Sequence, residues 1–214
     1  MSKLVRIFFK KTERAKYISH LDLQRTMQRA LKRAALPVWE TEGFNPHIYL
    51  TFALPLSLGI ESICESFDIK IIEEISPDEI RARLNAALTE DLQIIKAAEP
   101  VNKHTEIQKA EYEIRIVGDG VLDVPTKKFT EFLSQEEIMI TKKTKKGEAQ
   151  VDIKPLIELE AIEDEKITLL LPAGTSVNLN PMQVIGAFGA FLGVELQAVI
   201  TRTAVFCADG MTYN

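Results

Sequence analysis

The order in which two hydrophobic periodicities follow one another in the first hundred residues is the strongest constraint on the fold. Alternating apolar residues predict strands, and apolar residues three or four positions apart predict helices. In chain order, these elements cover 3–11 (strand), 19–35 (helix), 48–54 and 65–72 (strands), 76–88 (helix) and 92–97 (strand). This β-α-β-β-α-β order is that of the ferredoxin-like arrangement, in which antiparallel strands carry two helices on one face.

The second half of the chain repeats this order loosely. The predicted elements are 111–117 (strand), 125–136 (helix), 138–141 and 149–154 (strands), 157–162 paired with 167–171 (strands), 180–193 (helix) and 196–206 (strand). We therefore predict an α+β protein of two tandem ferredoxin-like (βαββαβ) domains, 1–100 and 109–214, the second with extra strands. The segment 99–108 would join them. A single mixed α+β domain is the structural alternative.

Composition narrows the class of protein. No apolar run reaches the roughly 18 to 20 residues of a membrane span, and the start of the chain does not resemble a secretory signal, so we expect a cytoplasmic protein. Cys64 and Cys207 are far apart and have no C-x-x-C partner, which argues against a metal or iron–sulfur site. Phosphate-binding loops, dinucleotide fingerprints, nucleophile elbows and zinc-protease motifs are all absent, so we expect no cofactor and no metal.

Charge is distributed unevenly along the chain. Residues 1–36 hold ten Lys and Arg against two acids, whereas the remainder holds 16 basic and 29 acidic residues. A basic end on an acidic body can bind a polyanion or the acidic face of another protein. A merely solvated, uneven surface is the alternative.

Two clusters of basic residues could contact RNA phosphates without reading sequence. They are the face of the first helix and a lysine-rich turn: Arg25, Arg29, Lys32, Arg33; Lys142, Lys143, Lys145, Lys146. Lys10, Lys11, Arg14 and Lys16 add a basic loop. Phe8, Tyr49 and Tyr112 are the candidates for stacking on bases, although apolar alternation places most phenylalanines in the core.

A candidate pocket combines the start of the first helix with the loop that follows it. Its predicted residues are Ser19, His20, Asp22, Gly43, Asn45 and His47. His20 and His47 could act as general acid and base in metal-independent RNA cleavage, or could bind a metal together with Asp22. Local hydrogen bonding that orders the helix start and the loop is the favoured interpretation, and we assign no catalytic residue.

Three N-terminal runs resemble one known family. The runs 17–23 (YISHLDL), 43–47 (GFNPH) and 52–62 (FALPLSLGIES) are together similar to the radical-SAM-linked protein family, bacterial proteins of uncharacterised function. The resemblance continues in 151–157 and 200–203. One departure is Ile48, where the family pattern usually has proline.

The resemblance implies a companion module of a radical SAM protein, because this chain lacks the radical enzyme's cysteine triplet. The gene neighbourhoods of such proteins imply RNA or the translation apparatus as the context. Our preferred hypothesis is an accessory protein that binds RNA, such as tRNA or rRNA, and presents it to the radical SAM partner. The alternatives are an endoribonuclease that uses His20 and His47 and a protein-interaction module without nucleic acid.

Overall fold

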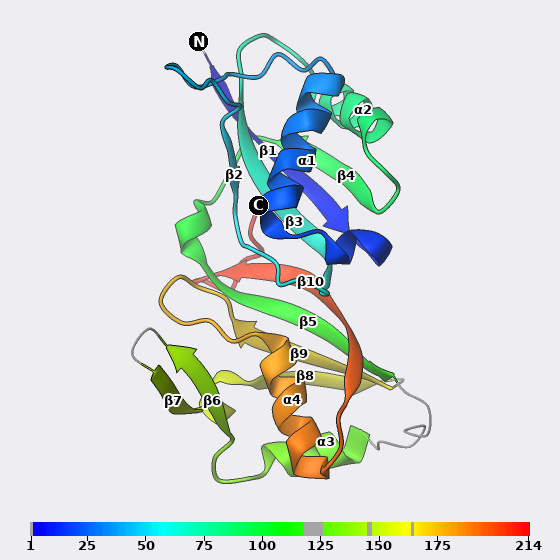
Figure 1. Cartoon of the computed structure of the whole chain (residues 1–214), viewed down its shortest axis with the longest axis vertical. Helices are drawn as coiled ribbons and strands as arrows, with labels where there is room; N and C mark the ends of the chain where they lie inside the picture. The colour runs from blue at the N-terminus through cyan, green and yellow to red at the C-terminus, as the bar shows by residue number, and fades with distance from the viewer. Residues whose placement is uncertain (1, 118–125, 145–146, 164) are drawn as a thin grey trace. The chain divides into compact units, whose positions relative to one another are not determined.

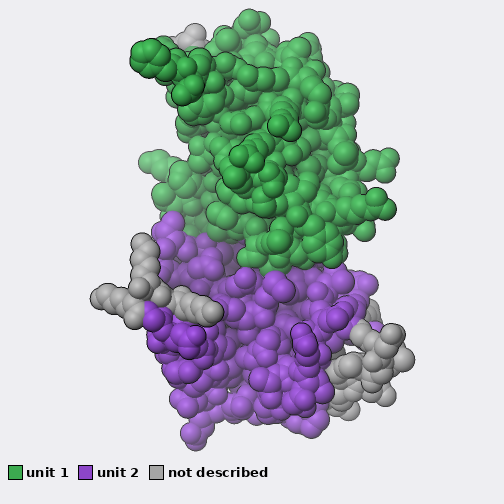
Figure 2. Space-filling model, viewed as in Figure 1, with its two compact units in different colours: residues 1–107, 211–214 green, residues 108–210 purple. Residues whose placement is uncertain are grey.

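A computed structural model of the chain describes residues 2–117, 126–144, 147–163 and 165–214. It is an α+β structure with mostly antiparallel strands and, within these residues, four α-helices. The chain divides into two compact units (Figure 2). Unit 1 comprises residues 1–107 and 211–214, and unit 2 comprises residues 108–210. The predicted boundaries placed 211–214 in the second half, whereas the structure places this segment with unit 1.

Unit 1 has the element order that the sequence predicts. Its strands and helices are β1 (Lys3–Lys11), α1 (His20–Arg33), β2 (Leu50–Phe52), β3 (Glu61–Ile71), α2 (Pro77–Ala87) and β4 (Leu92–Ala98), with short 3₁₀ turns at Glu13–Tyr17 and His104–Glu106. The strands lie in the order β4-β1-β3-β2, and β1–β3, β1–β4 and β2–β3 are all antiparallel. Both helices lie on one face of this sheet (Figure 1).

Helix α1 starts and packs as its sequence predicts. The hydroxyl of Ser19 accepts a hydrogen bond from the backbone N–H of Asp22, at 3.2 Å, and so caps the first turn. The apolar stripe that the spacing predicts is buried: Leu23, Met27, Ala30, Leu31 and Ala34. The opposite face, which carries Arg25 and Arg29, is left to solvent.

The core of unit 1 lies between the helices and one face of the sheet. Phe9 on β1 and Phe67 on β3 are fully buried, with ring centroids 5.6 Å apart, and Phe52 on β2 packs against both. Burial of each aromatic ring stabilises the fold by about 2 to 3 kcal/mol. The predicted alternation of β1 and β3 is therefore confirmed for the face that meets the helices.

Two strands differ in length from the prediction. β2 covers three residues instead of 48–54, because only Leu50–Phe52 pair with β3, and Ile48 forms an isolated bridge with Glu40. β3 begins at Glu61, four residues before the predicted start, because Ser62 pairs with Lys11 of β1. Backbone pairing extends β3 through polar residues that alternation does not detect.

The second face of the unit 1 sheet holds a buried charge. Arg6 on β1 is 1% exposed, and its guanidinium donates to both carboxylate oxygens of Asp68 on β3, at 2.7 and 2.9 Å. Its remaining nitrogen, Nη1, donates to the backbone oxygens of Asn102 and Asn214, at 2.9 and 2.8 Å. The ring of Tyr213 covers the guanidinium, 4.4 Å from ring centroid to Cζ. Arg6 thereby holds residues 211–214 against β1.

Unit 2 contains four strands paired in one run and a separate hairpin. Its elements are β5 (Ile107–Val117), α3 (Thr126–Leu133), β6 (Met139–Thr144), β7 (Gly147–Asp152), a 3₁₀ turn (Lys154–Leu156), β8 (Glu158–Glu163), β9 (Lys166–Pro172), α4 (Pro181–Leu192) and β10 (Gln197–Cys207). The sheet order is β10-β5-β9-β8, and β6 pairs only with β7. Phenylalanines of α3 and α4 pack together, with the rings of Phe129 and Phe188 5.0 Å apart.

Helix α4 is capped as predicted and contains two glycines with different surroundings. Asn180 accepts from the N–H of Met182 at 3.0 Å, and Gly193 ends the helix with a φ of 71°. A Cβ on Gly189 would lie 2.7 Å from the backbone oxygen of Val194, whereas a Cβ on Gly186 would meet nothing within 4 Å. Close packing therefore constrains Gly189, against the turn after the helix, whereas the site of Gly186 is open.

Candidate nucleic-acid interface

The solvent side of α1 presents four cationic side chains, which we call the basic face: Arg25, Arg29, Lys32 and Arg33. All four residues are exposed. Arg25 contacts Asp22 at 3.3 Å and Lys32 contacts Glu40 at 3.2 Å, while Arg33 donates to the backbone oxygen of Ala87 at 2.7 Å. Within the described part of the chain, no hydrogen bond or ion pair of Arg29 is found.

The ion pairs of the basic face are open to solvent. The side chains of Arg25 and Asp22 are 58% and 60% exposed, and those of Lys32 and Glu40 are 62% and 40% exposed. Exposed pairs of this kind contribute about 0 to 1 kcal/mol, so a phosphate could replace either carboxylate at little cost. The basic face can therefore accept anions although two of its members have acidic neighbours.

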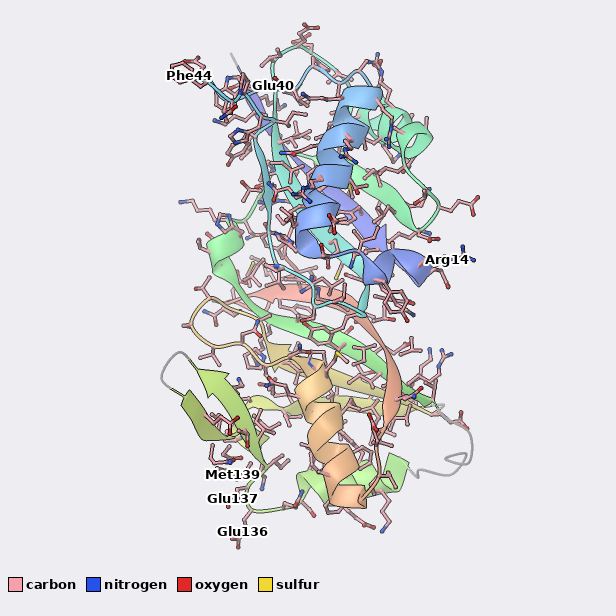
Figure 3. All side chains as sticks on the ribbon, viewed as in Figure 1. Arg14, Glu40, Phe44, Glu136, Glu137 and Met139 are labelled. Carbon is pink, nitrogen blue, oxygen red and sulfur yellow. The ribbon has the colours of Figure 1, made fainter. Side chains whose placement is uncertain are left out.

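Other basic residues of the N-terminal segment have structural roles. Arg6 is buried with Asp68, and Lys11, only 1% exposed, donates to the backbone oxygen of Lys16 at 3.1 Å. Lys16 donates to Glu61 at 2.8 Å, and this hydrogen bond raises the pKa of Lys16 above its ordinary value. Arg14 points away from the rest of the side chains (Figure 3) and is exposed. The excess positive charge of residues 1–36 is thus partly internal.

The predicted lysine-rich turn falls between β6 and β7. Lys145 and Lys146 lie outside the described residues, and the structure describes only the backbone of Lys143. Nζ of Lys142 donates to the backbone oxygen of Asn178 at 3.2 Å. Binding of RNA by this turn stays a prediction.

The helix start among the predicted pocket residues is a local hydrogen-bond cluster. The Ser19 hydroxyl donates to the Asp22 carboxylate at 2.7 Å, and Asp22 also accepts from Arg25. The pKa of Asp22 is lowered, first by the hydroxyl of Ser19 and then by Arg25. The carboxylate is therefore charged at neutral pH and stabilises the positive end of the helix.

The loop among the predicted pocket residues is closed at its base. The N–H of Thr41 donates to the backbone oxygen of His47 at 2.8 Å, and the N–H of His47 donates to Oγ1 of Thr41 at 3.1 Å. Nδ1 of His47 lies 2.9 Å from Oγ1 of Thr41 and 3.2 Å from the backbone oxygen of Asn45. Gly43 has a φ of 122°, which favours glycine. We call residues 42–46 the stapled loop.

The two candidate histidines have different neighbours. The ring of His20 packs on Phe52, with centroids 5.1 Å apart, whereas His47 bonds within the stapled loop. Phe52 follows His47 by five positions of largely extended chain, a span of about 16 Å at roughly 3.3 Å per residue. The described residues contain no group of three or more His, Cys, Asp or Glu side chains arranged to hold a metal. The structure thus gives no contact between His20 and His47.

The aromatic side chains available for stacking are not those the sequence favoured. Phe8 and Tyr112 are 8% and 6% exposed, which leaves little ring surface for a base. Tyr49 is half-buried beside Trp39, and the ammonium of Lys70 lies 4.9 and 4.7 Å from their respective ring centroids. Phe44, at the tip of the stapled loop, is 106% exposed and extends into solvent (Figure 3). A Gly-Phe-Asn-Pro run predicts a bend but not the exposure of its phenylalanine.

A cavity of about 770 Å³ in unit 1 has the wrong charge for an anion. It lies at the start of α2 and is lined by the carboxylates of Glu73, Glu74, Glu79 and Glu99, with Lys3 paired to Glu99. This cavity is therefore a poorer candidate for an anion than the basic face.

The fold and the exposed basic helix define the class: an α+β protein that presents four cationic side chains on the solvent side of α1. Residues 4–181 match the model of a family described as "uncharacterized protein conserved in bacteria (DUF2344)", and the chain belongs to this family. The family description names no activity and no partner enzyme.

Other comparisons add no function. No curated protein matches the chain. A crystal structure of a protein proposed to be a glycine cleavage system transcriptional repressor is 17% identical and covers 94% of this chain and 96% of that chain, with a TM-score of 0.26. An unknown protein from Galdieria sulphuraria is 11% identical, with 94% and 99% covered and a TM-score of 0.27. These TM-scores are too low to support an argument about fold or function. Within the described residues, no helix has the length and apolar character needed to cross a membrane.

Proposed function

We propose that the protein is an accessory factor that binds RNA through the basic face of α1 and presents it to a radical SAM enzyme. The observation that carries the RNA part is the exposure of Arg25, Arg29, Lys32 and Arg33 on one side of a rigid, capped helix. Because the helix backbone that carries these charges is already ordered, no backbone entropy is lost when they meet phosphates. Such contacts position RNA without reading its sequence.

We also propose that both units are ferredoxin-like domains. Unit 1 supports this with its β-α-β-β-α-β order and its strand order β4-β1-β3-β2. In unit 2, β10-β5-β9-β8 repeats that strand order if the hairpin β6–β7 is counted as an insertion. The fold alone does not imply function, so the RNA proposal depends on the basic face.

Removal of charge from the basic face tests RNA binding. The Arg25→Ala/Arg29→Ala variant should weaken binding of total cellular RNA at low salt, because two phosphate contacts are lost. The slope of log affinity against log salt should fall by about 2, roughly 1 for each residue removed. Fluorescence anisotropy at several salt concentrations measures both quantities.

A matched control exists on the other helix of unit 1. Arg81 and Arg83 on α2 are exposed and pair with Asp78 and Glu79, as Arg25 pairs with Asp22. The Arg81→Ala/Arg83→Ala variant removes the same charge and should leave the salt slope unchanged. Equal loss in both variants, or no retention of RNA by the unaltered protein at low ionic strength, would refute the proposal.

The radical SAM partner is the part supported only by the resemblance of the three N-terminal runs. Affinity purification of the tagged protein from its own cells, with and without ribonuclease, tests this part. A captured protein with a radical SAM cysteine triplet supports it. Capture that persists after ribonuclease, from a protein that retains no RNA, would favour a pure protein-interaction module instead.

A further inference from the structure

We propose that the stapled loop gives this interface a preference for unpaired RNA bases, with Phe44 as the stacking side chain. This inference rests on the proposed function, because it concerns the same surface. It specifies the substrate class as single-stranded RNA and not duplex. Three observations support it: the presentation of Phe44, its connection to the basic face, and the low exposure of Phe8 on the sheet face of unit 1.

Phe44 is presented by a loop whose base is held in place. Thr41 and His47 close the loop with backbone and side-chain hydrogen bonds of 2.8 to 3.1 Å, and Glu40 and Ile48 form a β-bridge just below. The side chain of Phe44 gains no burial from folding, since it is 106% exposed. An aromatic ring on an ordered support can stack on a base at a low cost in conformational entropy.

The base of the loop is bonded to α1. Lys32 of the basic face pairs with Glu40 at 3.2 Å, and Gln28, one turn earlier, lies 3.5 Å from the backbone oxygen of Ile48. Arg25 and Lys32 are separated by about 10 Å along the helix at 1.5 Å per residue. Cations that track a backbone therefore adjoin the segment that carries the ring. Cations along the backbone path together with an aromatic side chain are typical of single-strand binders.

The sheet face of unit 1 does not offer an equivalent platform at its centre. There, Phe8 is 8% exposed and lies under the ammonium of Lys96, 4.4 Å from its ring centroid. The ring of Tyr213 is occupied by Arg6. A duplex keeps its bases stacked inside, so Phe44 can contribute only where bases are unpaired.

The test compares two probes and three variants. The probes are a labelled, unstructured RNA of about 12 nucleotides, within the usual range of site sizes, and a duplex of the same strand with its complement. Phe44→Ala and Phe44→Leu should bind the single strand about 5-fold to 150-fold more weakly, and the duplex within twofold of the unaltered protein. Phe44→Tyr should restore single-strand binding, because it restores a π-face. Thermal unfolding should be unchanged in all three variants.

The outcomes separate this inference from the function it rests on. If Phe44→Leu binds the single strand as well as the unaltered protein, or loses both probes equally, the stacking role is refuted while RNA binding stands. If the unaltered protein binds neither probe, the proposed function itself fails. If Phe44→Ala keeps its RNA affinity but loses a co-purifying protein, the loop is a protein contact and the inference is overturned.

Discussion

Arg6 and Asp68 form a two-point hydrogen-bonded ion pair across β1 and β3, on the sheet face opposite the helices. The side chains of Arg6 and Asp68 are 1% and 12% exposed, so neither charge can be solvated unless the packing on this sheet face is disrupted. A buried pair of this kind contributes less through its attraction than it costs to leave one charge alone. Removal of one partner of the pair should therefore lower the stability of the fold strongly.

We expect Arg6→Ala to destabilise the protein by about 3 to 5 kcal/mol, because Asp68 would keep a buried charge without its partner. Lys3→Ala is the matched control: Lys3 lies on the same strand, and its pair with Glu99 is 64% and 70% exposed. Lys3→Ala should lower the free energy of unfolding by no more than about 1 kcal/mol. Urea unfolding measures both, and equal midpoints for the two variants would contradict the structural role of Arg6.

Asp22 should make stability depend on pH. Its folded pKa is lowered below the ordinary value of 3.8, so its contribution is present above pH 3.8 and is lost as pH falls through the folded value. Asp22→Asn should therefore be less stable than the unaltered protein at neutral pH, and the difference should vanish at low pH. Unfolding curves recorded across this range show whether the two proteins converge.

The hydroxyl of Ser19 is the first cause of that lowered pKa. Ser19→Ala should raise the pKa of Asp22 towards 3.8 and should destabilise the helix by about 1 kcal/mol through loss of the cap. A carboxyl titration by NMR checks the pKa. An unchanged value in Ser19→Ala would mean that Arg25 is the dominant cause.

The two glycines of α4 should respond in opposite directions to alanine. Gly189→Ala should destabilise by about 1 to 3 kcal/mol, because its Cβ would press on the backbone oxygen of Val194. Gly186→Ala should stabilise by about 0.5 to 1 kcal/mol, since alanine is the better helix former and the site is open. Thermal unfolding of the two variants measures both effects. A change of stability in the same direction for both would be inconsistent with this packing.

Thr41 should control the order of the stapled loop. Thr41→Val removes the oxygen that accepts from the N–H of His47, so this amide should exchange faster with solvent, with a loss of no more than about 1 kcal/mol in global stability. Thr41→Ser keeps the oxygen and should preserve the protection. Hydrogen exchange measured by NMR at His47 distinguishes the two, and equal rates in both variants would show that the hydroxyl does not close the loop.

Features that depend on neighbouring residues, such as helix starts and the buried face of a helix, could be predicted from the sequence. Ser19, Ser76 and Asn180 each mark a helix start because a short polar side chain can accept from the N–H groups of the first turn, and all three do so. The buried stripe of α1 follows from spacing in the same way. Those parts of the fold needed no knowledge of distant contacts.

The candidate site was harder to predict because its properties depend on distant residues. The sequence counts Arg6 only as one of ten basic residues in 1–36, because its partners Asp68 and Asn214 are 62 and 208 positions away. The stacking value of Phe8 was overestimated because alternation shows which side chains share a face and not what covers that face. Phe44 was missed for the converse reason, since a loop composition does not reveal whether its apolar side chain packs.

The position of Asn214 against Arg6 affects the timing of folding during synthesis. At 5 to 20 residues per second, a ribosome takes about 10 to 40 s to pass from residue 6 to residue 214. Once β3 and β4 have been made within that interval, β1 can pair with them, but the Arg6 guanidinium still lacks one of its two carbonyl acceptors and the ring that covers it. Until Tyr213 and Asn214 are made, water therefore has to solvate a buried cation on the sheet of the nascent first half.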